Sequence, residues 1–209
     1  MKTPRLGLAL ALLVLGFAGG WRWQAQQAHT APASSAPGVV DVGFAQFMAG
    51  HHEQAVTMAQ ILLAHGSSHL APAAQSIQTA QLMEIGAMRG WLTLWGKPAL
   101  PASRAMDWMR ATSEPPGPEL AKYLEDCKTA PGGMPGLATS EELDRLRTLD
   151  GAARDRLFVQ LMIRHHEGAL PMAHFAAQHA QLTAVRALAG QIELEQSQEL
   201  SRLRQLPGA

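Results

Sequence analysis

The chain has 209 residues, an apolar fraction of 47% and a formal net charge of zero, from 17 basic and 17 acidic side chains. This length is typical of one domain with a terminal extension, and the apolar content is enough for a hydrophobic core. The balanced charge and the lack of a basic run argue against a nucleic-acid partner. Because Cys127 is the only cysteine, an intrachain disulfide is excluded.

The N-terminus has the layout of an export signal. Lys2 and Arg5 precede a run of apolar and small residues that is short for a membrane span, and a Trp-Arg-Trp segment follows it. Aromatic residues at this place are typical of a membrane interface. We therefore expect residues 1–23 to be a signal peptide or a membrane anchor, and the protein to be exported to the periplasm or another extracytoplasmic compartment. Residues 24–39 are rich in Ala, Gln, Ser and Pro and predict a flexible linker.

One segment occurs twice. Residues 41–59 read DVGFAQFMAGHHEQAVTMA, and residues 155–173 read DRLFVQLMIRHHEGALPMA. In both copies apolar residues recur every three or four positions, which predicts an amphipathic helix. A second helix with a Q-x-x-E motif follows each copy, at about 72–95 in the first case. The repeated unit is therefore a helical hairpin, and residues 40–206 are expected to form one all-α bundle domain.

Local signals set the expected helix ends. Asp41 is a good N-cap for the first helix, and Thr139 with Glu142 forms a capping box in the connector at about 97–149. A further short helix is expected at 118–127. Pro171 takes the place of a threonine deep inside the second copy and removes a backbone amide, so we expect a kink there.

The predicted apolar faces have polar side chains at their centres. In the first hairpin these are His51, Gln81 and Glu84, with His52 beside them, and the second hairpin repeats the pattern. Burial of such groups without partners costs several kcal/mol in order-of-magnitude terms. Two solutions remain open. The histidines bind the glutamates as a structural network, His51 with Glu84 in the first hairpin, or the side chains bind a metal ion.

The ligand types favour copper. Thioether with imidazole suits Cu(I), and histidines alone suit Cu(II), whereas zinc sites ordinarily use Cys, His or carboxylate. Methionine at helical spacing is usually core filler, and its repetition beside histidines weakens that interpretation. A looser, exposed methionine site in the connector is also considered. The candidate metal ligands are Met48, His51, His52, Met58, Glu84, Met162, His165, His166, Met172 and Glu199.

Catalysis fits the sequence poorly. No G-x-S-x-G, H-E-x-x-H or phosphate-binding glycine loop is present. A di-iron site needs more inward carboxylates than two Q-x-x-E motifs supply. We therefore expect a copper-binding protein for buffering or delivery and not an enzyme. A structural or interaction module with buried His-Glu pairs is the alternative, and a metal-dependent oxidase is a third hypothesis. Homo-oligomer formation is left open.

The doubled D-x-x-F-x-x-x-M-x-x-H-H-x-x-A-x-x-M-A segment, the Q-x-x-E-I helix and the Met-Pro-Gly-Leu sequence at 134–137 resemble a bacterial family known as domain of unknown function 305. The resemblance covers about 40–206. It implies a ferritin-like four-helix bundle, and it implies copper binding because some members resemble periplasmic copper-binding proteins. Pro171 departs from the family pattern and puts the geometry of the second histidine pair in question.

Overall fold

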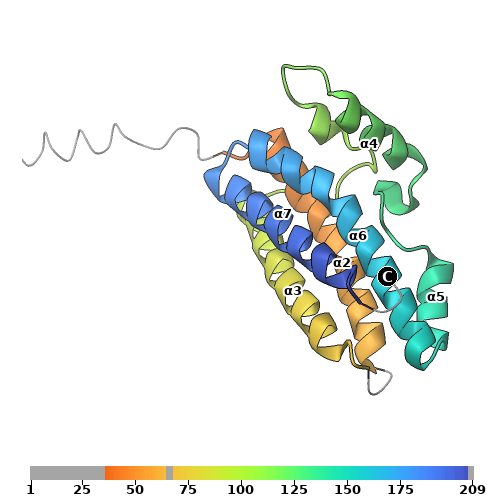
Figure 1. The fold of residues 1–209 in the computed structure, drawn as a ribbon. Coiled ribbons are helices and arrows are strands. Elements are labelled where there is room, and N and C mark those ends of the chain that lie inside the picture. Colours follow the sequence, from red (N-terminus) through yellow and green to blue (C-terminus); the bar gives the residue numbers. More distant parts are fainter. Residues whose placement is uncertain (1–35, 65–67, 207–209) are drawn as a thin grey trace, which may run out of the picture. The chain divides into compact units, whose positions relative to one another are not determined.

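The two copies of the repeated segment form the long helices α2 (Val39–Ala64) and α6 (Gly151–His179) in this computed structural model (Figure 1). The structure describes residues 36–64 and 68–206. Each long helix is followed by a partner helix, α3 (Ala71–Leu94) or α7 (Thr183–Leu203). The predicted signal or anchor at 1–23 and nearly all of the predicted linker lie outside the described residues.

Short elements make up the connector between the two hairpins. They are η1 (Asp107–Arg110), α4 (Pro118–Thr129), η2 (Pro131–Gly133) and α5 (Ser140–Thr148). The described residues contain no β-strand, so the all-α prediction is confirmed for this part of the chain. Within the same residues, no helix is long and apolar enough to span a membrane.

Helix α2 packs against both α3 and α6, and α6 packs against α7 (Figure 1). The core has two apolar clusters. In the first, Phe44 and Met48 near the start of α2 join Phe175 near the end of α6. The second cluster joins Leu62 near the end of α2 to Phe158 near the start of α6. The two long helices therefore run antiparallel, and their middle sections lie between the clusters.

The N-cap role expected for Asp41 is wrong. Helix α2 begins at Val39, so Asp41 is the third helical residue and reaches back to the amide of Gly38, which donates to Oδ2 at 2.7 Å. The carboxylate also accepts from the amides of Gln181 (3.2 Å) and Leu182 (2.9 Å). This buried side chain thus ties the start of α2 to the loop between α6 and α7.

Two other local signals have clear outcomes. Helix α5 begins with the predicted capping box, because the Thr139 side chain accepts from the amide of Glu142 and the Glu142 side chain accepts from the amide of Thr139. Helix α6 continues through Pro171 as a single helix of 29 residues, so the proline does not end the helix, and the kink expected there stays a prediction.

Candidate metal centre

A layer of buried polar side chains separates the two apolar clusters. We call it the polar layer; its members are His51, His52, Gln81, Glu84, His165, His166, Gln196 and Glu199. All four histidines are fully buried, both glutamines and Glu84 are buried, and only Glu199 is half-buried. Each of the helices α2, α3, α6 and α7 contributes two residues. The two Q-x-x-E motifs and the two histidine pairs are thus brought to one level.

His51 and His165 form the centre of this layer. Their ring centroids are 3.8 Å apart with an interplanar angle of 41°. The Nε2–H of His165 donates to the backbone carbonyl oxygen of His51 at 2.9 Å, which fixes the tautomer of His165. The rings of His52 and His166 lie further out, with centroids 6.4 Å and 5.9 Å from their chain neighbours.

The outer histidines pair with the two carboxylates. His166 Nε2 donates to Glu199 Oε2 at 2.6 Å. His52 Nε2 lies 2.8 Å from Glu84 Oε2, an ion-pair distance, although this contact lacks the geometry of a hydrogen bond. The predicted pairing of Glu84 with His51 is therefore wrong. Consecutive residues point about 100° apart around a helix, so His51 faces α6 while His52 faces α3.

Several nitrogen and oxygen atoms in the layer have no hydrogen-bond partner among the described residues. They include Nδ1 of His52, His165 and His166, and both side-chain amide atoms of Gln81 and Gln196. Neither ring nitrogen of His51 makes a hydrogen bond of standard geometry, although the Pro135 carbonyl is close enough to affect its protonation. Buried polar atoms are nearly always satisfied in folded proteins, so this concentration is unusual.

The central histidines are neutral. Burial lowers the pKa of His51 to about 3; the nearby His52 and His166 rings lower it further, and the Pro135 carbonyl opposes the change. Burial, and then the repulsion that a protonated His51 would exert, also lower the pKa of His165 well below its usual value. A neutral imidazole has a free lone pair, which is the form that binds metal ions.

Four fully buried methionines flank the polar layer. Met48 and Met172 lie in the first apolar cluster, and Met58 and Met162 lie in the second. Because α2 and α6 are antiparallel, each side of the layer receives one methionine from each long helix. The described residues contain no group of three or more His, Cys, Asp or Glu side chains arranged to hold a metal ion. A site built around these histidines therefore needs thioether sulfur or a shift of side chains.

The methionines of the connector do not form the exposed site considered above. Met106, Met109 and Met134 are buried and belong to the first apolar cluster. Met109 is fully buried, next to Trp108, which packs edge-on against Phe44. These three methionines are part of the hydrophobic core. The sequence could not predict this, because the connector has no helical periodicity that would show which of its side chains are buried.

Two equivalent surface salt bridges that were not predicted from the sequence flank the polar layer. Arg89 of α3 pairs with Glu53 of α2, and Arg204, just after α7, pairs with Glu167 of α6 at 2.6 Å. Each glutamate directly follows a histidine pair, and each arginine lies five residues after the glutamate of a Q-x-x-E motif. That shared spacing was the signal available. In each hairpin, a surface ion pair therefore links the two helices near their His-Glu contact.

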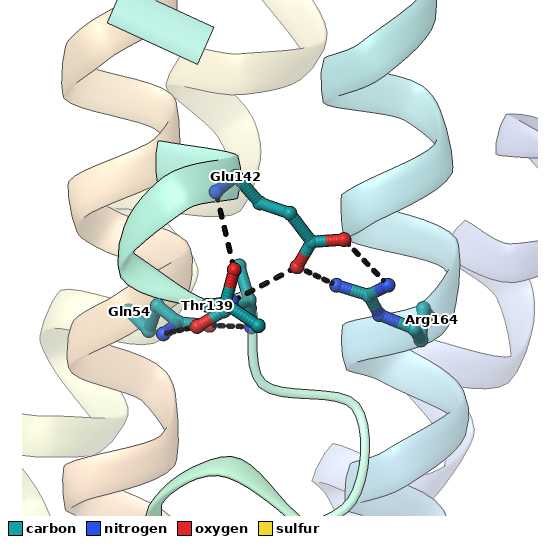
Figure 2. A network of polar contacts seen from close by, with 5 residues as sticks. Gln54, Thr139, Glu142 and Arg164 are labelled. Atoms are coloured by element: carbon teal, nitrogen blue, oxygen red, sulfur yellow. Dashed lines mark hydrogen bonds and ion pairs between the residues drawn. The ribbon is translucent and has the colours of Figure 1, made fainter. Parts of the chain in front are cut away.

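The segment before α5 has a structural role that the sequence pattern does not predict. Residues 134–139, which we call the cover, lie against both long helices. The side chain of Gln54 makes two hydrogen bonds with the backbone of Ala138, and Glu142 forms a bidentate ion pair with Arg164 (Figure 2). A methyl group at Gly168 of α6 would overlap the Pro135 carbonyl. The cover is therefore held at the level of the histidines.

In the described residues, fold and site together define an all-helical protein with two buried histidine pairs in one polar layer. The chain belongs to the family described as domain of unknown function (DUF305), whose profile matches residues 41–207. The resemblance seen in the sequence is thus confirmed. No curated protein sequence matches the chain.

Solved structures of related proteins agree with this assignment. A DUF305 protein from Streptomyces coelicolor, described as a candidate secreted protein, is 30% identical with a TM-score of 0.66, over 78% of this chain and 89% of that one. A DUF305 fragment from Deinococcus radiodurans is 28% identical with a TM-score of 0.60, over 81% and 95%. CopM in its Cu(I)-bound form is 26% identical with a TM-score of 0.56, over 79% and 93%. Its Cu(II)-bound form gives a TM-score of 0.55.

Proposed function

We propose that this protein is exported and binds copper outside the cytoplasm. The proposed ligands are histidine nitrogens of the polar layer and the methionine sulfurs beside it. One observation supports this above all. His52, His165 and His166 each have one ring nitrogen against an oxygen atom and the other without a partner. Metal-binding histidines are typically oriented in this way, by a carboxylate or a carbonyl at the second nitrogen.

The donor set favours copper over other metals. The central imidazoles are neutral, and the four flanking methionines supply thioether sulfur, a ligand that favours Cu(I) over zinc. The similarity to CopM, whose structures contain Cu(I) and Cu(II), is consistent with this choice. The proposed ligands are His51, His52, His165 and His166 with Met48, Met58, Met162 and Met172, and Glu84 and Glu199 are either ligands or the groups that orient the outer histidines.

The proposal includes a specific architecture. We propose a ferritin-like four-helix bundle made of two duplicated hairpins, α2–α3 and α6–α7, within a domain at 40–206. The repeated His-Glu contacts and the repeated Glu53–Arg89 and Glu167–Arg204 ion pairs support it. Residues 1–23 are proposed to direct export, as a cleaved signal or a retained anchor, with 24–39 as a linker. The description of the Streptomyces relative as a secreted protein supports export.

A second candidate function follows from a specific observation. His166 donates a hydrogen bond to Glu199, and His52 lies within ion-pair distance of Glu84, so the polar layer could serve only to specify how the helices pair. The partnerless nitrogens and glutamine amides argue against this, because a purely structural layer gains nothing from leaving them unsatisfied.

Metal analysis of the full chain, purified from an export compartment without added metal, tests the proposed function. Copper above the level of other transition metals, at a fixed ratio to protein, is the expected result. Zinc or no metal at all, in a compartment that contains available copper, would favour the structural alternative.

A further inference from the structure

The Met-Pro-Gly-Leu sequence at 134–137 lies across the polar layer. Met134 and Leu137 are buried in the first apolar cluster, and Ala138 is buried in the second. The cover thus bridges the two clusters between which the histidines lie. It contains a turn but no helix or strand, so its position depends on the contacts that it makes with the helices.

The backbone of the cover packs directly on α6. Gly136 adopts a left-handed conformation (φ 89°) that favours glycine, and a methyl group there would overlap the Arg164 carbonyl. On the helix side, Gly168 leaves room for the Pro135 carbonyl, and its own carbonyl accepts a hydrogen bond from the Tyr123 hydroxyl at 3.0 Å. Gly136 and Gly168 therefore allow the backbone of the cover to contact the backbone of α6.

Two side chains fix the ends of this contact (Figure 2). Gln54, two residues after His52 on α2, donates to the Ala138 carbonyl at 3.0 Å and accepts from the Ala138 amide at 2.6 Å. Glu142 accepts from Arg164, the residue before His165, at 2.9 Å and 2.5 Å. Each tether thus starts within two residues of a histidine pair.

We infer that the cover positions the His51 ring and restricts access to the polar layer, and that Gln54 and Glu142 are positioning residues that act through it. The inference rests on the proposed copper function for its biological meaning. The cover packs directly on α6 at Gly168 and is tied to α2 by Gln54, which places the Pro135 carbonyl near the His51 ring without a hydrogen bond of standard geometry. The position of this carbonyl beside His51 therefore depends on the contacts of the cover.

The experiment compares Gln54→Ala and Glu142→Ala with matched controls. Gln60→Ala changes an exposed glutamine on the same helix α2, and Asp144→Ala breaks an exposed ion pair with Arg147 within α5. Three quantities are measured on the full-length chain: hydrogen exchange of the Ala138 amide without metal, the side-chain nitrogen NMR signals of His51 without metal, and the rate of Cu(I) transfer to a competing chelator.

We expect both tether variants to exchange the Ala138 amide at least about tenfold faster, to change the His51 tautomer signals and to release Cu(I) about 10–100-fold faster, as is typical of groups that orient metal ligands. Glu142→Gln keeps an acceptor for Arg164, so each of the three measured quantities should return most of the way to its value in the parent protein. The two controls should match the parent.

Two results would overturn the inference: unchanged Ala138 exchange, or faster exchange with unchanged His51 signals. If the parent binds no Cu(I), the proposed function fails. The two metal-free measurements then still decide whether the cover positions His51.

Discussion

His51 and His165 meet at the crossing of α2 and α6 with ring centroids 3.8 Å apart, although 114 residues separate them in the chain. The ring of His165 also donates a hydrogen bond to the backbone carbonyl of His51. Each of these two histidines therefore depends on the other hairpin for its contacts. The centre of the polar layer therefore exists only when both copies of the repeat are folded against each other.

The His-Glu contacts should contribute to stability in proportion to their burial. Glu84→Ala leaves the fully buried His52 without its carboxylate, so we expect the metal-free protein to lose about 2–3 kcal/mol. Glu199→Ala should cost less, because its side chain is twice as exposed. Glu53→Ala breaks an exposed ion pair and should cost less than about 1 kcal/mol. Urea unfolding of the three variants measures these differences. Equal losses of unfolding free energy for Glu53→Ala and Glu84→Ala would contradict the claim that buried His-Glu contacts stabilise the protein more than exposed ion pairs do.

Two glycines in helix interiors should respond to alanine with opposite signs. Gly168→Ala places a methyl group against the Pro135 carbonyl and should destabilise the protein by about 1–3 kcal/mol, because backbone must move. Gly190→Ala in α7 meets open space and should stabilise it by about 0.5–1 kcal/mol. Thermal unfolding checks both. A stabilising Gly168→Ala would mean that the cover does not contact α6 as described.

Stability without metal should fall as the pH drops below about 6.5. Because burial lowers the pKa of His51 to about 3 and also that of His165, these histidines bind protons in the unfolded chain before they do so in the folded one. Each therefore contributes a loss of up to about 1.4 kcal/mol per pH unit between its unfolded and folded pKa values.

Urea unfolding at pH 7, 6 and 5 tests this, with His174→Ala as a control because that histidine is exposed. The control should follow the parent. A His51→Ala variant with an equally steep pH dependence would show that the buried ring does not cause it.

The sequence predicted the periodic parts of this structure and little of the rest. The duplicated helices and the capping box at Thr139 depend on local spacing, which a single sequence contains. The choice between His51 and His52 as the partner of Glu84 depends on which neighbour lies on each side of α2, and periodicity does not specify this. Asp41 shows the same limit, because its acceptor role involves Leu182 from the far end of the domain.

The cover was unpredictable for a different reason. Its six residues have no repeat, and its position results from close backbone packing of Gly136 and Gly168 and from tethers at Gln54 and Arg164. None of these residues is unusual where it stands in the sequence. Only their juxtaposition reveals that a Met-Pro-Gly-Leu turn lies over the histidines.

The most direct test of the copper proposal is a Cu(I) competition titration of the parent and of the His51→Ala/His165→Ala variant, with unfolding of both in the metal-free state. Asparagine in place of both histidines gives a second variant that keeps polar groups there. Because no described side chain gives either ring a carboxylate partner, we predict that both variants lose high-affinity Cu(I) binding, while the stability at pH 7 of at least the asparagine variant changes by less than about 1–2 kcal/mol. A parent that binds no Cu(I), together with a stability loss above about 3 kcal/mol in both variants, would contradict the proposal and assign these histidines to structure alone.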